Sequence, residues 1–346
     1  MNMTNQPLVT INVPAFNAQA TIKETLESLL NQTYENIEIH VIDNNSNDKT
    51  REIIETYLGP KLKLIRNDTN IGAGSFEKCM RLGSGKYTAI YHADDVYDKD
   101  IIAKSVNLFE GNEQLGLVMT RAQFIDGDSK ITGESKKISS LRKNHRADLI
   151  LNFQELFTLI LKNHNFLICP SAMVRSSIYK NKISRWREDL FKSSADLDVW
   201  FSISTLSKLA IINETLIKYR RSQHHFSHLY NLKRTEEADF FKAIDYWLKK
   251  DVVKSFISEK DLRNYTLLQF EDSLKCCLHA ALLNDNELAS SLMNKLKNLY
   301  SADYLIRSRK SLAFALGYFI LRAYELPLTK KILLPLLKKM NSVLIH

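Results

Sequence analysis

The first two hundred residues alternate between short β-prone runs and amphipathic helical stretches, and this alternation strongly constrains the fold. A β-prone run at 8–13 is stopped by Pro14, and a helix with one apolar face follows at 22–30. The same pattern continues, with strands expected at 37–42, 62–65 and 87–91 and helices at 53–58 and 75–82. Strands separated by helices of this length predict a parallel sheet with right-handed crossovers.

The pattern changes along the rest of the chain. The further elements that we expect are a strand at 117–125, a long polar loop at 126–146, a helix at 150–161 and strands at 166–174 and 216–219. Beyond about residue 230 the strand signals stop, and helical periodicity covers 235–248, 261–283 and 287–299. We therefore predict an α/β domain at residues 1–230 and a helical region at 231–346.

The net charge of +9 is concentrated near the C-terminus. From Tyr304 onward, eight Lys and Arg residues stand against Glu325 alone. Lys330–Lys331 and Lys338–Lys339 flank the apolar run 332–337, which fits an amphipathic helix on an anionic membrane surface or one packed on the protein itself. No zinc-finger spacing or base-reading basic helix accompanies this charge, so nucleic acid is not an expected partner.

Cysteine usage and the apolar segments bear on localisation. The four cysteines, at 79, 169, 276 and 277, show neither C-x-x-C spacing nor a disulfide framework. The first residues lack the basic start and apolar run of a secretion signal, and no run of about twenty apolar residues predicts a spanning helix. We therefore expect a cytoplasmic protein, or one peripheral on the inner face of the cell membrane.

Two adjacent carboxylates, Asp94 and Asp95, follow the fourth β-prone run. Ligands of open α/β sheets bind beyond the carboxyl ends of the strands, where this pair is expected to lie. Carboxylates at the end of a buried strand are unfavourable without a positive partner, and a divalent cation with oxygen ligands is the usual one. An isolated Asp-Asp pair is more often a solvated turn, but polar motifs at the other strand ends favour a metal site.

Those motifs occur in a fixed order. They are Pro14-Ala15-Phe16-Asn17, Asp43-Asn44-Asn45-Ser46, Asn70-Ile71-Gly72-Ala73-Gly74 and His92-Ala93-Asp94-Asp95. A dinucleotide fingerprint is excluded at the third motif because Glu77 stands where its last glycine belongs. With this order and spacing, the chain from roughly Val9 to Ser227 resembles the family 2 glycosyltransferases. The resemblance implies the GT-A fold, which is a mixed, mainly parallel sheet flanked by helices.

The resemblance also assigns a site for a nucleotide-sugar donor. Phe16 matches an aromatic position beside the base, and Asp43 matches a carboxylate that accepts a hydrogen bond from uracil or an equivalent base, although it could instead cap a turn. The residues assigned to nucleotide-sugar binding are Pro14, Ala15, Phe16, Asn17, Asp43, Asn70, Gly72, Lys78, Asp94 and Arg220. Arg220 is expected to fork onto phosphate oxygens.

In the resemblance, Asp94 and Asp95 bind Mn²⁺ or Mg²⁺, with His224 preferred over His225 as a further ligand. An acidic residue usually precedes the pair by two positions, and His92 stands there in this chain. This departure leaves the identity of the complete ligand set open.

Asp196 matches the catalytic base of the family, within Ala195-Asp196-Leu197-Asp198. A base is needed because the acceptor hydroxyl loses its proton as its oxygen attacks the sugar. Taken alone, Asp196 could be a helix N-cap. Asp198 is given a structural role at the same helix.

These features predict a metal-dependent, inverting glycosyltransferase that moves a sugar from a nucleotide-sugar, expected to be a UDP-sugar, to a hydroxyl of a saccharide or lipid-linked acceptor. One alternative is a non-catalytic protein that keeps the fold as a scaffold in a membrane assembly, because His92 and Ala195 replace common acidic positions. A second is a nucleotidyltransferase, although the loop after the first strand lacks the Gly-rich, basic composition of that class.

Overall fold

The computed structural model describes residues 6–141, 147–221, 234–283 and 285–299. The chain divides into two compact units, residues 1–222 and 223–346. The first unit is built on a mixed sheet, and the described part of the second unit is helical.

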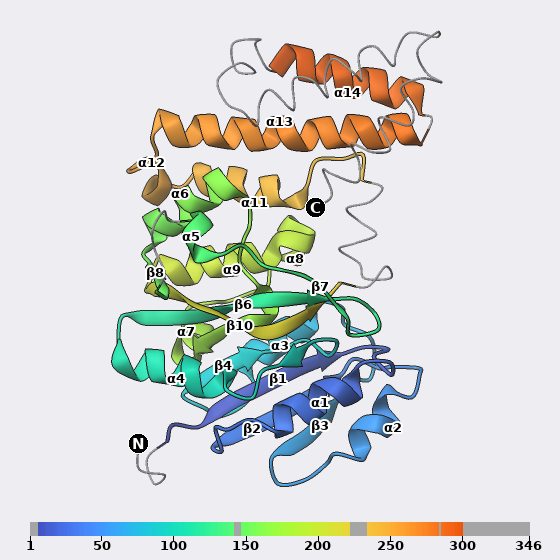
Figure 1. The fold of residues 1–346 in the computed structure, drawn as a ribbon, viewed down its shortest axis with the longest axis vertical. Coiled ribbons are helices and arrows are strands. Elements are labelled where there is room, and N and C mark those ends of the chain that lie inside the picture. The colour runs from blue at the N-terminus through green and yellow to red at the C-terminus, as the bar shows by residue number, and fades with distance from the viewer. Residues whose placement is uncertain (1–5, 142–146, 222–233, 284, 300–346) are drawn as a thin grey trace. The chain divides into compact units, whose positions relative to one another are not determined.

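The sheet of the first unit has the strand order β3-β2-β1-β4-β9-β6-β10-β5, with β7 paired to β6 and β8 to β10 (Figure 1). Its strands are β1 Val9–Ala15, β2 Ile37–Asp43, β3 Leu62–Arg66, β4 Tyr87–Ile90, β5 Val96–Tyr97, β6 Leu115–Ile125, β7 Ile131–Glu134, β8 Leu149–Leu151, β9 Met173–Arg175 and β10 Lys208–Arg220. The helices between them are α1 Ile22–Leu30, α2 Thr50–Glu55, α3 Gly74–Arg81, α4 Ile101–Gly111, α5 Ile138–Leu141, α6 Phe153–Asn163, α7 Ser176–Asn181, α8 Glu188–Phe191 and α9 Ala195–Ser204.

Most long strands of this sheet run in one direction. β1 is parallel to β2 and β4, β2 is parallel to β3, and β6 is parallel to β10. The short strand β9 is antiparallel to both β4 and β6 and joins the two parallel parts. The carboxyl ends of β1, β2, β4, β6 and β10 therefore point toward the same edge. The predicted mixed, mainly parallel sheet is confirmed.

The crossovers place helices on both faces of the sheet. From β1 the chain steps outward through α1 and α2 to β3, and then returns past β1 through α3 to β4. Because right-handed crossovers in opposite directions put their helices on opposite faces, α1 and α2 cover one face and α3 the other (Figure 1).

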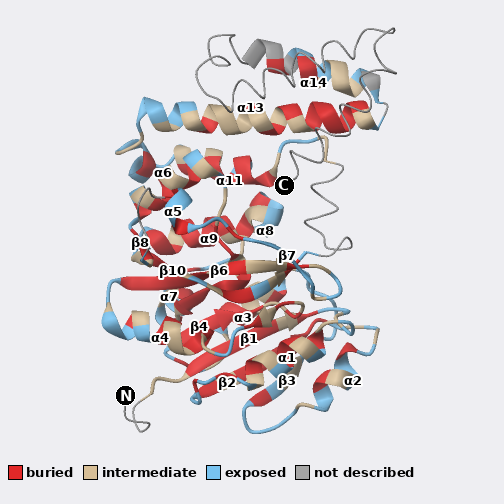
Figure 2. Ribbon diagram, viewed as in Figure 1, coloured by how far each residue is buried: buried red, intermediate tan, exposed pale blue. Residues whose placement is uncertain are grey.

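The core lies along the central strands (Figure 2). In β1, Val9, Ile11 and Val13 have no exposed surface, because a strand covered on both faces takes apolar residues throughout. Each such side chain stabilises the fold by about 1.5–3 kcal/mol relative to an exposed one. β1 continues through Pro14, whose backbone N and carbonyl oxygen face β4, as those of Asn12 do. Pairing with β4 ends at Asn12, so the missing N–H of the proline removes no ladder bond.

Two expectations about the middle of the chain were wrong. The segment 126–146 is not one long loop, since a tight turn at Asp126–Lys130 leads into β7 and α5 follows. All four residues of β7 are exposed, so the sequence has no alternation of apolar and polar residues there that would predict a strand. The strand expected at 166–174 is interrupted by a 3₁₀ turn at Cys169–Ser171, and only β9, which starts at Met173, pairs in the sheet. Pro170 accounts for this because it cannot donate to a ladder.

The second unit contains α11 Asp239–Leu248, α12 Asp251–Lys254, α13 Glu259–Leu282 and α14 Asn286–Leu299. Ser258 and Asp261 form a capping box that starts α13. Asp272, on the same helix, forms a buried ion pair with Arg234. Within the described residues, no helix combines the length and apolarity needed to cross a membrane.

Candidate active site

The predicted site motifs gather at the carboxyl edge of the sheet. Phe16 and Asn17 directly follow β1, and Asp43 is the last residue of β2. The Asp94–Asp95 pair follows β4, and Arg220 ends β10. The parallel direction of these strands thus brings together residues that lie far apart in the sequence.

His92, Asp94 and Asp95 form a cluster with ligand geometry. One ligand atom from each side chain lies within 4.8 Å of the others. Oδ1 of Asp95 accepts a hydrogen bond of 2.7 Å from the main-chain N–H of Arg220. Oδ2 of Asp95 is buried, and it has no hydrogen-bond partner among the described residues. Burial, and then the charge of Asp94, raise the pKa of Asp95 well above its usual range.

This cluster fits a divalent cation. A buried carboxylate oxygen without a donor is unfavourable, and a cation bound between Asp94 and Asp95 would remove that cost and favour the ionised form. Oxygen ligands suit Mg²⁺, and an additional imidazole such as that of His92 is accepted by Mn²⁺. His92, where sequence reasoning saw only a departure, therefore belongs to the candidate ligand set.

One face of α1 holds the backbone of this cluster. The hydroxyl of Thr21, just before α1, donates to the carbonyl oxygen of Ala93 over 3.0 Å, and the hydroxyl of Thr25 donates to that of Asp95 over 2.7 Å. The phenolic oxygen of Tyr97 accepts from the main-chain N–H of His92 over 2.7 Å. Sequence reasoning missed these threonines, although their i, i+4 spacing places them on one helix face.

Arg220 does not point into open space. Its side chain is only 4% exposed, and its Nε donates to the carbonyl oxygen of Asp94 over 2.8 Å. The guanidinium also reaches Glu24 on α1 and the turn that begins at Asp126. Each of the three guanidinium nitrogens donates to a protein oxygen, so the expected fork onto phosphate oxygens stays a prediction that competes with these contacts.

The loops after β1 and β2 are tied to each other. The N–H of Asn17 donates to Oγ of Ser46 over 3.0 Å, and Oδ1 of Asn17 accepts from the N–H of Asn47 over 3.0 Å. Asp43 is buried, and its Oδ1 accepts from the N–H of Ser46 over 3.0 Å. Phe16, in contrast, is 47% exposed beside these loops. An exposed ring at this edge of the sheet offers a surface on which a base can stack.

A network of asparagines shapes the loop after β3. Oδ1 of Asn70 accepts from the N–H of Gly72 over 2.8 Å and from Nδ2 of Asn44 over 2.7 Å. Gly72 has a φ of 54°, a backbone conformation that would be strained for a residue with a side chain. Nζ of Lys78 donates to Oδ1 of Asn67 over 2.6 Å, and Asn67 in turn donates to Asn44. Lys78 is thus engaged in supporting this loop.

Asp196 lies in the first turn of α9, where Ser194 takes the N-cap position. Asp196 is half-buried, and its Oδ1 accepts from the N–H of Leu197 over 2.8 Å. Burial raises the pKa of Asp196 to about 6, opposed by the N–H of Leu197 and by the side chains of Trp200 and Cys169. A carboxylate with such a pKa is ionised at neutral pH and is a better proton acceptor than an ordinary aspartate.

The Cys169 thiol is influenced by the charges of both Asp196 and Asp95. Burial, and then the charge of Asp196, raise the pKa of the Cys169 thiol well above its usual range, and the charge of Asp95 acts in the same direction. The thiol therefore lies within electrostatic reach of both carboxylates. The fold thus brings together the expected base and the expected metal ligands.

An aromatic cluster beside His92 was not predicted. The rings of Phe76 on α3 and Trp186 stack with centroids 4.7 Å apart, and the His92 ring meets Phe76 edge-on at 5.7 Å. Single aromatic residues in separate segments carry no sequence signal that would pair them. His224, His225 and the basic segment from Tyr304 onward lie outside the described residues, so their expected roles stay predictions.

Comparison with known proteins identifies the family. The model of glycosyl transferase family 2 matches residues 10–181. An uncharacterized glycosyltransferase from Haemophilus influenzae is 31% identical over 257 residues, which cover 72% of this chain and 76% of that protein. The chain therefore belongs to glycosyl transferase family 2. The resemblance that the motifs indicated is confirmed, and the chain is a glycosyltransferase.

Two further proteins are informative. The crystal structure of TarS residues 1–349 from S. aureus, in complex with UDP-GlcNAc, superposes with a TM-score of 0.60 at 15% identity and covers 92% of this chain and 91% of that one. It supports the GT-A fold. WfaP from Escherichia coli, a UDP-Glc:alpha-D-GlcNAc-diphosphoundecaprenol beta-1,3-glucosyltransferase, is 33% identical over 127 residues, or 36% of this chain and 50% of that one.

Proposed function

We propose that this protein is a metal-dependent, inverting glycosyltransferase that moves a sugar from a UDP-sugar to a hydroxyl of a saccharide or lipid-linked acceptor in cell-surface polysaccharide assembly. The observation that carries the proposal is the buried Oδ2 of Asp95, which has no hydrogen-bond partner in the described part of the chain and lies in a cluster with Asp94 and His92. A buried acceptor of this kind is retained where a cation occupies it.

The donor would bind along the carboxyl edge of the sheet. Phe16 would stack on the base, and Asp43 would accept a hydrogen bond from it. A fixed acceptor can discriminate between bases, because a mismatched partner would leave a hydrogen-bonding group unpaired. Asn70 and Gly72 would shape the floor of the pocket, with Lys78 holding that loop through Asn67. The preference for a uridine nucleotide is supported by the names of WfaP and of the TarS complex.

The cation would be Mn²⁺ or Mg²⁺, held by Asp94 and Asp95 with His92, and with His224 as a further ligand. When bound, the cation offsets the negative charge that develops on the leaving nucleoside diphosphate. Asp95 contributes through Oδ2, because its Oδ1 is engaged with the N–H of Arg220.

Asp196 would act as the base. Its pKa of about 6 leaves the carboxylate ionised at neutral pH and able to take the proton of the acceptor hydroxyl. The acceptor oxygen would then attack the anomeric carbon from the face opposite the nucleotide. A single base, with no second carboxylate assigned as nucleophile, favours direct displacement and inversion.

The acceptor would be a saccharide, free or linked to a lipid. The name of WfaP specifies a diphosphoundecaprenol acceptor, and AmsB from Erwinia amylovora is named for amylovoran biosynthesis.

The basic segment from Tyr304 onward would bring the protein to an anionic membrane surface on the cytoplasmic side. Vesicle sedimentation of the full chain and of a version ending near Leu299 tests this role, because an anchoring segment makes only the full chain bind.

Calorimetric titration with UDP, GDP and CDP, each with and without Mn²⁺, tests the site. We expect Mn²⁺-dependent binding of UDP in the wild type and its loss in Asp94→Asn. A scaffold or a protein with an inactive site would bind no nucleotide in a metal-dependent way. A nucleotidyltransferase would bind a nucleoside triphosphate more tightly than the diphosphate, so UTP is included as a fourth ligand.

A further inference from the structure

Arg220 forms a dense set of contacts at the carboxyl edge of the sheet. Its main-chain N–H donates to Oδ1 of Asp95, and its Nε donates to the carbonyl oxygen of Asp94. One terminal nitrogen donates to the carbonyl oxygen of Asp126 over 2.9 Å and to Oγ of Ser129 over 3.0 Å. Arg220 therefore contacts two of the proposed metal ligands, Asp94 and Asp95, and the turn between β6 and β7.

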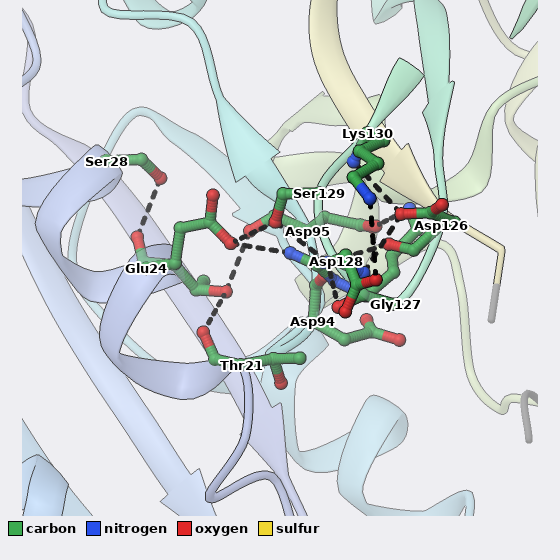
Figure 3. Close-up of polar contacts among 12 residues, drawn as sticks. Thr21, Glu24, Ser28, Asp94, Asp95, Asp126, Gly127, Asp128, Ser129 and Lys130 are labelled. Carbon is green, nitrogen blue, oxygen red and sulfur yellow. Dashed lines mark hydrogen bonds and ion pairs between the residues drawn. The ribbon is translucent and has the colours of Figure 1, made fainter. Parts of the chain in front are cut away.

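Glu24 completes this arrangement. Its Oε2 accepts from the other terminal nitrogen of Arg220 over 2.6 Å and from the hydroxyl of Ser129 over 2.9 Å. Figure 3 shows Glu24 on α1 facing Ser129 and the Asp94–Asp95 pair. Arg220 is nearly fully buried, whereas the Glu24 side chain is 44% exposed. The Glu24 carboxylate thus binds the terminal nitrogen that the turn does not contact, and each of the three guanidinium nitrogens donates to a protein oxygen.

We propose that Arg220 and Glu24 form a positioning pair that presets the Asp94–Asp95 carboxylates for the cation and joins them to the turn at 126–129. The hydrogen bond from the Arg220 N–H engages Oδ1 of Asp95 and leaves the buried Oδ2 for the metal. The side chain holds the Asp94 carbonyl, the turn and α1 in one arrangement. This inference rests on the proposed metal site.

The alternative role for Arg220 is a direct contact with the donor diphosphate. That role requires a free pair of N–H groups, but Nε and both terminal nitrogens already donate to protein oxygens. A partner carboxylate such as Glu24 would also repel a diphosphate at the same guanidinium. The two roles predict different effects of removing Glu24. If Arg220 and Glu24 form a positioning pair, metal binding is weakened. If Arg220 binds phosphate, its guanidinium is freed for the diphosphate.

The experiment compares Glu24→Ala, Arg220→Lys and their double variant with the wild type, using Mn²⁺ alone as the probe. Because the Glu24 side chain is 44% exposed and lies outside the apolar core, its variant is expected to fold even if Arg220→Lys does not. Arg175→Lys is the matched control. Arg175 donates to the carbonyl oxygens of Phe109, Asn112 and Leu115 and contacts none of the proposed metal ligands.

We expect Glu24→Ala and Arg220→Lys each to weaken Mn²⁺ binding about tenfold or more, as removal of outer-sphere partners of metal ligands does. The double variant should lose less than the product of the two single effects, because the residues act together. Arg175→Lys should bind Mn²⁺ like the wild type at a temperature where all variants are folded. Unchanged Mn²⁺ affinity in Glu24→Ala would overturn the inference, and an increased UDP affinity of the same variant would indicate a phosphate contact instead.

Hydrogen exchange without metal separates this inference from the proposed function. In Glu24→Ala and Arg220→Lys, exchange should increase at both 92–97 and 122–131, and Arg175→Lys should leave these segments unchanged. If the wild type binds no Mn²⁺, or if Asp95→Asn binds it as well as the wild type does, the proposed metal site is wrong. If Mn²⁺ binds at Asp95 but exchange does not change in both segments of the two variants, the metal site stands and the positioning pair is wrong.

Discussion

Arg187 holds Asp198 with two hydrogen bonds, from Nε to Oδ2 over 2.8 Å and from a terminal nitrogen to Oδ1 over 2.5 Å. Asp198 is buried on α9, two residues after Asp196. The ion pair fixes the first turn of α9 to the segment before α8. The expected structural role of Asp198 is thus explained by a buried ion pair.

Loss of the base should reduce turnover and leave nucleotide binding intact. We expect Asp196→Asn to lower kcat by about 10²–10⁴-fold, the usual contribution of a general base. UDP release measured with a UDP-sugar donor gives kcat, and calorimetry gives the affinity for UDP with Mn²⁺. The control is Asp189→Asn, which removes an exposed carboxylate on α8. Equal turnover in Asp196→Asn and the control would contradict the assignment.

The pH dependence of turnover should follow Asp196. Since burial raises the pKa of this base to about 6, the active, ionised form is lost as the pH falls below 6. We expect kcat/KM to fall about tenfold per pH unit on the acid side and to level off above pH 7. Initial rates between pH 4.5 and 8, at constant Mn²⁺, measure the profile. The same slope in the residual activity of Asp196→Asn would assign the titration to another group.

The raised pKa of Asp196 also affects stability. The folded state keeps a proton that the unfolded state releases between about pH 4 and 6, so stability falls as the pH rises through this window. Asp196→Asn removes that loss. The variant should therefore gain up to about 3 kcal/mol relative to the wild type at pH 7.5, and little of this at pH 4. Urea unfolding at both pH values tests the difference, and a gain independent of pH would refute the explanation.

The ion pair at α9 should matter more than its exposed neighbour. Arg187→Ala leaves the Asp198 carboxylate buried without its cation, which we expect to cost about 3–5 kcal/mol of the free energy of unfolding. Arg185→Ala removes an exposed pair with Asp189, which should change that free energy by less than about 1 kcal/mol. Denaturant unfolding of the two variants makes the comparison, and equal losses would show that the Asp198 site tolerates solvation.

Phe16 offers a test of the nucleotide pocket that does not disturb the core. We expect Phe16→Ala to weaken UDP binding by about 1–3 kcal/mol, the usual contribution of stacking between a base and an aromatic ring. Both Phe16 and the control residue Leu58 are about half exposed, so neither variant should lose much stability. Calorimetry with UDP and Mn²⁺ measures the change. An affinity in Phe16→Ala equal to that in Leu58→Ala would exclude base stacking at this ring.

Much of the fold could be predicted from local sequence patterns. The β-prone runs that became β1, β2, β3 and β4, and the apolar face of α1, are local features, because the side-chain period of an element is set within a few residues. The motifs at the strand ends were also predictable, because each is a short contiguous stretch of the sequence. Parallel strands then place their carboxyl ends at one edge. The exposed strand β7 lacked such a pattern and was missed.

The sequence by itself determined the alternation of strands and helices and the carboxylates at the sheet edge. Only the tertiary structure decided how these groups are held. Thr25 reaches Asp95 across 70 positions of sequence, and Arg220 reaches Glu24 across 196. Such pairings depend on the path of the whole chain, because a hydrogen bond requires atoms about 3 Å apart and periodicity specifies only neighbours within one element. For that reason the sequence gives Arg220 only an expected contact with phosphate, and its pairing with Glu24 and with the turn at Asp126 is seen only in the structure.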